Sequence, residues 1–270
     1  DTLESRGLGD VYKRQPLLIK PYLSSMTRHE LLIIMTVGMS TIAGSVMVVY
    51  TTMLFPIYGA GLIGHFLSAS LISVPAAIMY SNIMLPSDVK TDFPDKSSNE
   101  LYGSVMDAIT QGTKNGLDIF LNVIAMLIVV MALVFLVNSI LSLFPPLFGD
   151  PITLELLLGY LFAPLAWFMG ISWEESIIAG QLLGVKTALN EFVAYLYLAD
   201  TETYQLSDKS RLIMLYALCG FANFSSVGIL LSGLSAMIPE RRMDLISVSG
   251  KALWGALLAS CLTGFMIGIL

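Results

Sequence analysis

The sequence predicts an all-α integral membrane protein, a multi-helix bundle that contains a re-entrant hairpin and a discontinuous helix. Of the 270 residues, 56% are hydrophobic and 13% are charged, whereas an ordinary soluble domain has roughly 25% charged residues. Asp, Glu, Lys and Arg are absent from five runs: residues 31–87, 119–149, 156–173, 212–239 and 252–270. A membrane-spanning helix needs about 20 apolar residues, so most of these runs can supply one.

The first fifteen residues, DTLESRGLGDVYKRQ, differ from the rest of the chain. They are polar and of mixed charge, and they lack the apolar region of a signal peptide. We therefore expect residues 1–15 to be a non-native leader or linker and residues 16–270 to be the membrane domain. Because the apolar sequence opens in the middle of an element, PLLIKPYL, we also expect that an N-terminal part is missing.

The first half of the membrane domain predicts two apolar elements. Residues 29–55 read as a spanning helix, in which small residues such as Gly38 and Gly44 let a neighbouring helix approach closely. Residues 58–85 are interrupted by glycines and by Pro75. They fit either a second span or a kinked interfacial segment, and the interfacial arrangement is favoured.

The middle of the chain begins with its longest polar stretch, residues 86–116, which belongs in water or at the lipid headgroups. A long spanning helix is expected at 113–144, followed by a proline-rich turn. Residues 152–170 contain aromatic side chains of the kind that gather at a membrane surface, so an interfacial helix is expected there.

An Asn190–Glu191 pair interrupts the apolar region 172–200. The apolar stretches on either side of the pair are too short for either to cross a bilayer alone. Two short halves that meet at a polar tip predict a re-entrant hairpin, whose tip needs protein or water around it.

The last two spans are predicted at 208–238 and 251–270. The centre of the first reads GFANFSSVG, and its glycines, Asn and serines favour a helix broken at mid-membrane. A continuous helix whose polar side chains bond a neighbour is the alternative. Residues 26–38 and 238–250 also share a short pattern, which is expected of a transporter built from repeats.

The two interrupted segments predict a binding site for a polyhydroxyl ligand. Glu191 can accept hydrogen bonds from adjacent hydroxyls, and Asn223 can both donate and accept. The aromatic rings that could cover a ring face of such a ligand are Phe192, Phe221 and Phe224. The alternative is a structural role, in which Glu191 bonds Lys186 or a backbone group. No HExxH or CxxC pattern occurs in the sequence, so we expect no metal site.

GQLLGVKTALNEFVAYLYL, followed by CGFANFSSVGILL, resembles the C-terminal half of the concentrative nucleoside transporters. The similarity covers essentially all of residues 16–270. The resemblance implies a homotrimer, multi-pass in the cell (inner) membrane, that couples nucleoside uptake to a sodium or proton gradient. It implies no other cofactor and no nucleic-acid partner.

The resemblance also assigns roles to individual residues. It implies that Glu191, at the tip of the hairpin, accepts hydrogen bonds from the ribose hydroxyls. Asn223 and Ser226 would bond the ribose, and Phe221 would pack against the base. The neighbours Asn190 and Phe192 would shape the tip.

Two pieces of that family's pattern are expected to be absent from this chain. They are the first hairpin, which contacts the nucleobase, and the first broken helix, which carries the sodium site with that hairpin. The chain is therefore expected to be a fragment with part of the binding site missing. An intramembrane enzyme that uses Glu191 and a channel are the rival interpretations. Against them, the sequence shows no nucleophile–base pair of recognisable spacing and no filter-like repeats.

Overall fold

The computed structural model describes residues 22–87, 132–146 and 151–270, with isolated positions between 104 and 129. The leader expected at 1–15 and much of the first half of the span expected at 113–144 lie outside these residues. The described elements are helical throughout, which confirms the all-α fold class. The helices are α2 (Arg28–Ser40), α3 (Gly44–Tyr58), α4 (Leu62–Met84), α6 (Leu154–Phe168), α7 (Trp173–Ala188), α8 (Glu191–Ala199), α9 (Asp208–Ala217), α10 (Phe224–Met237) and α11 (Arg242–Ile269).

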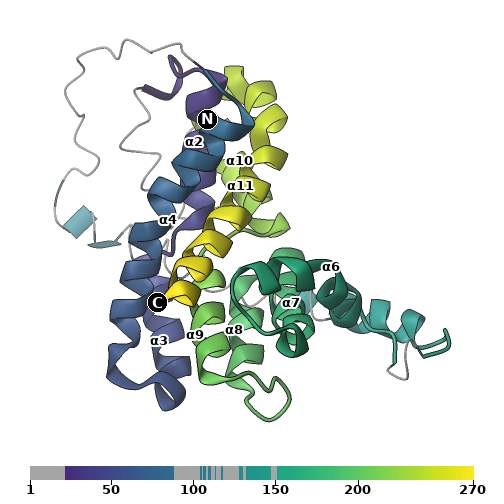
Figure 1. Ribbon diagram of the computed structural model, residues 1–270. Coiled ribbons are helices and arrows are strands. Elements are labelled where there is room, and N and C mark those ends of the chain that lie inside the picture. Colours follow the sequence, from purple (N-terminus) through teal and green to yellow (C-terminus); the bar gives the residue numbers. More distant parts are fainter. Residues whose placement is uncertain are drawn as a thin grey trace.

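The helix α11 organises the bundle. It packs against α2 and α4 along one part of its length and against α9 further along, and α2 and α4 also pack against each other. Figure 1 shows α2, α4 and α11 side by side, with α7, α8 and α9 gathered beyond the end of this group. The helix α6 packs mainly against α7. The hairpin helices α7 and α8, together with α9, therefore lie near one end of the long helices, whereas α10 packs along α11.

A break at residues 41–43 separates α2 from α3, so the segment expected as a single span at 29–55 is not one continuous helix. Thr41 and Ala43 have extended backbone angles. The hydroxyl of Thr41 donates to the carbonyl of Val37, and the backbone N–H of Ile42 donates to the hydroxyl of Ser70 on α4 at 3.0 Å. Side-chain hydroxyls thus replace the helical hydrogen bonds, which allows the backbone to leave the helix.

The described part of the chain therefore contains two broken helices, α2/α3 and α9/α10. The second was expected at 208–238 and is confirmed as discontinuous, since residues 218–223 are not helical. The first corrects the expectation that the chain has only one. A sequence pattern of small and apolar residues does not distinguish a continuous helix from one whose hydroxyl groups take over its backbone bonds.

The helix α4 differs from the interfacial segment expected at 58–85. It is continuous over 23 residues although it contains Pro75, because a proline removes a single hydrogen bond without necessarily ending a helix. Residues Val46–Met84 are long and apolar enough to cross a membrane, by length and composition. Together with the packing of α4 along α2 and α11, this favours a span.

The helices α6 and α7 are joined by a bend of 118°, and glycines bring their backbones together. A Cβ atom on Gly180 would lie 2.4 Å from the carbonyl oxygen of Gly159, and one on Gly184 would lie 2.3 Å from the Cβ of Leu158. Small residues four positions apart allow this close approach of two helices. The helix α6 lies within the segment 152–170, whose interfacial location stays a prediction.

The hairpin predicted at 172–200 consists of α7 and α8, separated at Leu189 and Asn190. The last helix, α11, begins at Arg242, nine residues before the predicted start of the final span at residue 251. Its first turn contacts the start of α2: Asp244 accepts from Arg28 at 2.5 Å and from Arg241 at 2.7 Å. The two segments that share a sequence pattern therefore begin beside each other.

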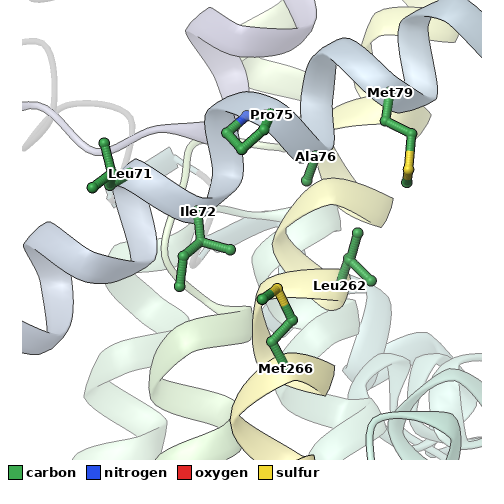
Figure 2. A pocket seen from close by; sticks show the side chains of 7 residues that line it. All are labelled: Leu71, Ile72, Pro75, Ala76, Met79, Leu262 and Met266. Carbon is green, nitrogen blue, oxygen red and sulfur yellow. The ribbon is translucent and has the colours of Figure 1, made fainter.

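A shallow groove of about 440 Å³ runs between α4 and α11. Figure 2 shows that its lining consists of apolar side chains: Leu71, Ile72, Pro75, Ala76, Met79, Leu262 and Met266. A polyhydroxyl ligand would find no side-chain hydrogen-bond partner there. The groove includes none of the predicted site residues, so it is not the candidate site.

Candidate functional site

The carboxylate of Glu191 lies inside the protein, where three elements meet. Its side chain is 5% exposed. One oxygen accepts a hydrogen bond from the Tyr50 hydroxyl of α3 at 2.8 Å, and the other accepts from the Asn223 side-chain amide at 2.9 Å. Asn223 directly precedes α10. The structure thus brings together the acid of the hairpin tip and the amide of the broken helix, as the sequence predicted.

Both half-helices at this point begin with an asparagine cap. The Asn190 side chain accepts from the Val193 backbone N–H at 2.9 Å and caps α8. The Asn223 side chain accepts from the Ser226 backbone N–H at 2.7 Å and caps α10. Asn favours this position because its oxygen satisfies a backbone donor that the helix leaves unpaired. Asn190 and Ser226 are therefore placed by the caps, next to Glu191 and Asn223.

The electrostatics of the two helix starts favour a negative charge. The N-terminal end of an α-helix carries a partial positive charge, and Glu191 is the first residue of α8. Its hydrogen bond to Asn223 places it at the start of α10 as well. A carboxylate, or a ligand rich in oxygen, is the group that such a junction stabilises.

Lys186, one of the two partners that the structural alternative offered, is not hydrogen-bonded to Glu191. It is fully buried, and its ammonium donates to the Ala217 carbonyl and to the Ser260 hydroxyl. Glu191 instead bonds Tyr50 and Asn223.

Aromatic rings surround one side of the carboxylate. Phe192 lies 6.1 Å from Tyr50 between ring centroids, and Tyr50 lies 4.8 Å from Tyr195. Phe221 is buried in the break between α9 and α10, at 7% exposed. Phe224 is 65% exposed, so it does not contribute to this cluster as the sequence suggested.

Tyr50 is the member of the site that the sequence analysis missed. It is 1% exposed and donates directly to Glu191. Its sequence neighbourhood, MVVYTTML, reads as an apolar span with an ordinary aromatic residue. The only signal was that a buried tyrosine hydroxyl needs a hydrogen-bond partner, and the sequence does not say which residue provides it.

The junction can bind hydroxyl groups. A carboxylate offers about four acceptor positions, and Tyr50 and Asn223 use one on each oxygen, so acceptor capacity is left for a ligand hydroxyl. The Asn223 amide has a second N–H group to donate, while its oxygen is committed to the cap of α10. Among the described residues, no group of three or more His, Cys, Asp or Glu side chains could hold a metal ion.

The chain is similar to known membrane transporters. Residues 65–268 match the family described as "Na+ dependent nucleoside transporter C-terminus". The chain is 39% identical over 260 residues to the "Uncharacterized transporter YutK" of Bacillus subtilis, covering 94% of this chain and 62% of that protein. It is 35% identical over 259 residues to the "Nucleoside permease NupC" of Helicobacter pylori, covering 94% of this chain and 60% of that protein.

A solved structure shares the fold. The structure of CNTnw in an inward-facing substrate-bound state matches with a TM-score of 0.85 and 33% sequence identity, over 98% of this chain and 62% of that one. The chain thus spans about 60% of the length of these three relatives. The named relatives are transporters rather than enzymes. With its hairpin, its broken helices and its matched family segment, the chain belongs to the family of Na+-dependent, concentrative nucleoside transporters and corresponds to their C-terminal part.

Proposed function

We propose that the protein containing this chain takes up nucleosides across the cytoplasmic (inner) membrane, coupled to a sodium or proton gradient. The observation that carries the proposal is the Glu191 carboxylate, which is buried at the meeting point of α8 and α10 and is bonded by Tyr50 and Asn223. Relatives named for sodium-dependent nucleoside transport and for nucleoside permease activity support the substrate class.

In this proposal the ribose binds at the junction of the half-helices. Glu191 accepts from the ribose hydroxyls, and Asn223 donates through its second amide N–H. Ser226, in the first turn of α10 and 3% exposed, bonds the same sugar. Phe221 packs against the base, and Asn190 and Phe192 hold the tip in shape.

The bilayer and a second and third copy of the protein are the other proposed partners. Large apolar side chains are exposed on α3 and α4, among them Phe55 at 54%, Leu71 at 75% and Ile83 at 66%. Such side chains suit contact with lipid or with another membrane protein. We propose a homotrimer, as the family resemblance implies.

Uptake of radiolabelled uridine into proteoliposomes tests the function. The full-length protein is assayed with an inward sodium gradient, with an inward proton gradient and with neither. We expect saturable uptake that one of the two gradients drives against a concentration difference. Uptake that ignores both gradients, or no uptake of any nucleoside, would contradict the proposal.

The same assay separates the rival functions. An intramembrane enzyme would release chemically altered uridine, which chromatography of the vesicle contents detects. A channel would conduct without saturating and would not show accelerated exchange when the vesicles are preloaded with unlabelled uridine. We expect unchanged uridine and accelerated exchange.

A further inference from the structure

The helix α9 ends inside the protein, at the break before α10. An α-helix leaves its last four carbonyl oxygens without partners in the helix, and buried carbonyls need partners elsewhere. Backbone N–H groups just beyond α9 bond two of these carbonyls: Leu218 donates to Met214 at 2.8 Å, and Cys219 donates to Tyr216 at 3.1 Å. The other two of these four carbonyls, those of Leu215 and Ala217, are bonded by side chains of the hairpin.

The hairpin α7–α8 completes the end of α9. The Tyr195 hydroxyl donates to the Leu215 carbonyl at 2.9 Å, and the Lys186 ammonium donates to the Ala217 carbonyl at 2.8 Å. The same ammonium donates to the hydroxyl of Ser260 in α11 at 2.7 Å. Lys186 is 0% exposed. One buried cation thus joins α7, α9 and α11 where α9 stops.

The charge of Lys186 suits this place. The C-terminal end of a helix carries a partial negative charge, and backbone carbonyls at the ends of interrupted membrane helices are typical cation ligands. The helix α8 ends in a similar way, because buried Arg211 donates to the Leu198 carbonyl at 2.9 Å. Fully buried lysines are rare in proteins because their charge is costly to desolvate, so this one calls for a specific role.

Lys186 and its partner Ala217 lie close in sequence to the two central residues of the candidate site. Lys186 precedes Glu191 by five positions, and its partner Ala217 precedes Asn223 by six. Several hydrogen bonds join the hairpin to the α9/α10 segment, among them Lys186 with Ala217, Tyr195 with Leu215, and Glu191 with Asn223. Loss of the Lys186 bond would loosen the packing that holds Glu191 against Asn223.

We propose that Lys186 is a positioning residue, a cation tethered to the hairpin that holds the end of α9 and thereby sets the geometry of Glu191 and Asn223 for the ligand. It contacts the ligand nowhere. Its ammonium stabilises the partial negative charge at the end of α9 as a bound monovalent cation would. The Ala217 carbonyl and the Ser260 hydroxyl accept its hydrogen bonds. The effect of Lys186 on nucleoside binding rests on the proposed function, whereas its role as a cation at the end of α9 does not.

The first experiment compares Lys186→Met with wild type in the full-length protein. Methionine has a similar length but no charge and no N–H donor. We expect the KM for uridine to rise at least about tenfold, as for the loss of a charged hydrogen bond, while the trimer survives in size-exclusion chromatography. Lys209→Met is the matched control, since Lys209 is exposed on α9, and we expect wild-type KM. A wild-type KM in Lys186→Met would overturn the positioning role.

The second experiment needs no transport. Lys186→Ala removes three methylenes and the ammonium, which is the size of n-propylammonium. We expect millimolar n-propylammonium chloride to raise the Tm of Lys186→Ala in detergent by several degrees, and to restore part of its uridine affinity. Wild type and Lys186→Met, whose sites are filled, serve as controls and should show no shift, and tetramethylammonium chloride at equal ionic strength should have no effect.

The two experiments separate the two proposals. If wild type carries no nucleoside, the proposed function fails while the Tm measurement still decides the role of Lys186. If Lys186→Met does not fold, the response of Lys186→Ala to n-propylammonium decides it. An equal Tm response in all variants, or none in Lys186→Ala, would show that the site needs no cation and would end this inference.

Discussion

The side-chain amide of Asn223 donates to the carboxylate of Glu191 at 2.9 Å, although 32 positions separate the two residues in the sequence. Each residue lies at the start of a half-helix, α10 for Asn223 and α8 for Glu191. The bond therefore connects the hairpin tip to the broken helix at the centre of the candidate site. Substitutions that disturb this bond, or the geometry behind it, test the site directly.

Glu191→Gln should weaken ribonucleoside binding while the protein stays folded. Glutamine keeps the shape but loses the charge and one acceptor oxygen, so we expect uridine affinity to fall about tenfold to a hundredfold, the worth of a hydrogen bond to a charged group. Calorimetric titration of the full-length protein measures the affinity. Glu240→Gln is the control, because Glu240 is exposed in the turn before α11.

The same titration with 2′,3′-dideoxyuridine identifies the group that Glu191 recognises. This analogue lacks the adjacent 2′ and 3′ hydroxyls of the ribose, so we expect wild type and Glu191→Gln to bind it with similar, weak affinity. An equal loss for uridine and for the analogue would mean that Glu191 acts on the fold of the site rather than on the ribose.

Tyr50→Phe should destabilise the protein through Glu191. The change removes only the hydroxyl that donates to the carboxylate at 2.8 Å, and it leaves the buried ring in place. In a double-mutant cycle with Glu191→Gln, we expect a coupling energy of about 0.5–3 kcal/mol between the two positions. Thermal unfolding of the four proteins in detergent gives the values. Additive effects would show that the hydroxyl and the carboxylate do not interact in the working protein.

Gly220→Ala should prevent the two broken helices from packing. Gly220 has a φ of 116°, and a Cβ atom there would lie 2.6 Å from the carbonyl oxygen of Ser40 at the end of α2. We expect a loss of about 1–3 kcal/mol from the backbone conformation alone, seen as a lower Tm and a lower yield of folded protein.

Gly228→Ala is the matched control for this position. Gly228 lies within α10, and a Cβ atom there would meet no other atom within 4 Å. Alanine favours a helix over glycine by about 0.5–1 kcal/mol, so we expect an unchanged or higher Tm. A similar loss of stability in both variants would argue against a specific close contact at Gly220.

Arg241→Ala should cost more stability than Arg28→Ala, although both arginines bond Asp244. The Arg28 side chain is 65% exposed, and an exposed ion pair contributes about 0–1 kcal/mol. Arg241 is 20% exposed and also donates to the Met26 carbonyl at 2.5 Å. We expect Arg241→Ala to lower the free energy of unfolding by about 1.5–3 kcal/mol. Chemical denaturation of both variants measures the difference, and equal losses would contradict this ranking.

The sequence by itself determined the class of the protein and the two central segments of its site. A lone carboxylate and a cluster of amide and hydroxyl groups within apolar runs are costly in a membrane, so their presence predicted the hairpin tip at Glu191 and the break at Asn223. The structure adds that an Asn cap, a local interaction between residues three positions apart, begins both α8 and α10.

Only the tertiary structure decided which distant groups complete the site. The break after α2 depends on a hydroxyl of α4, Tyr50 is a partner of Glu191 only because α3 packs beside α8, and Lys186 bonds the end of α9 rather than the nearby acid. Each of these hydrogen bonds joins elements that are remote along the chain. In a bundle of uniformly apolar helices the sequence pattern does not fix how the helices face one another, so packing alone determines where each buried polar group finds its partner.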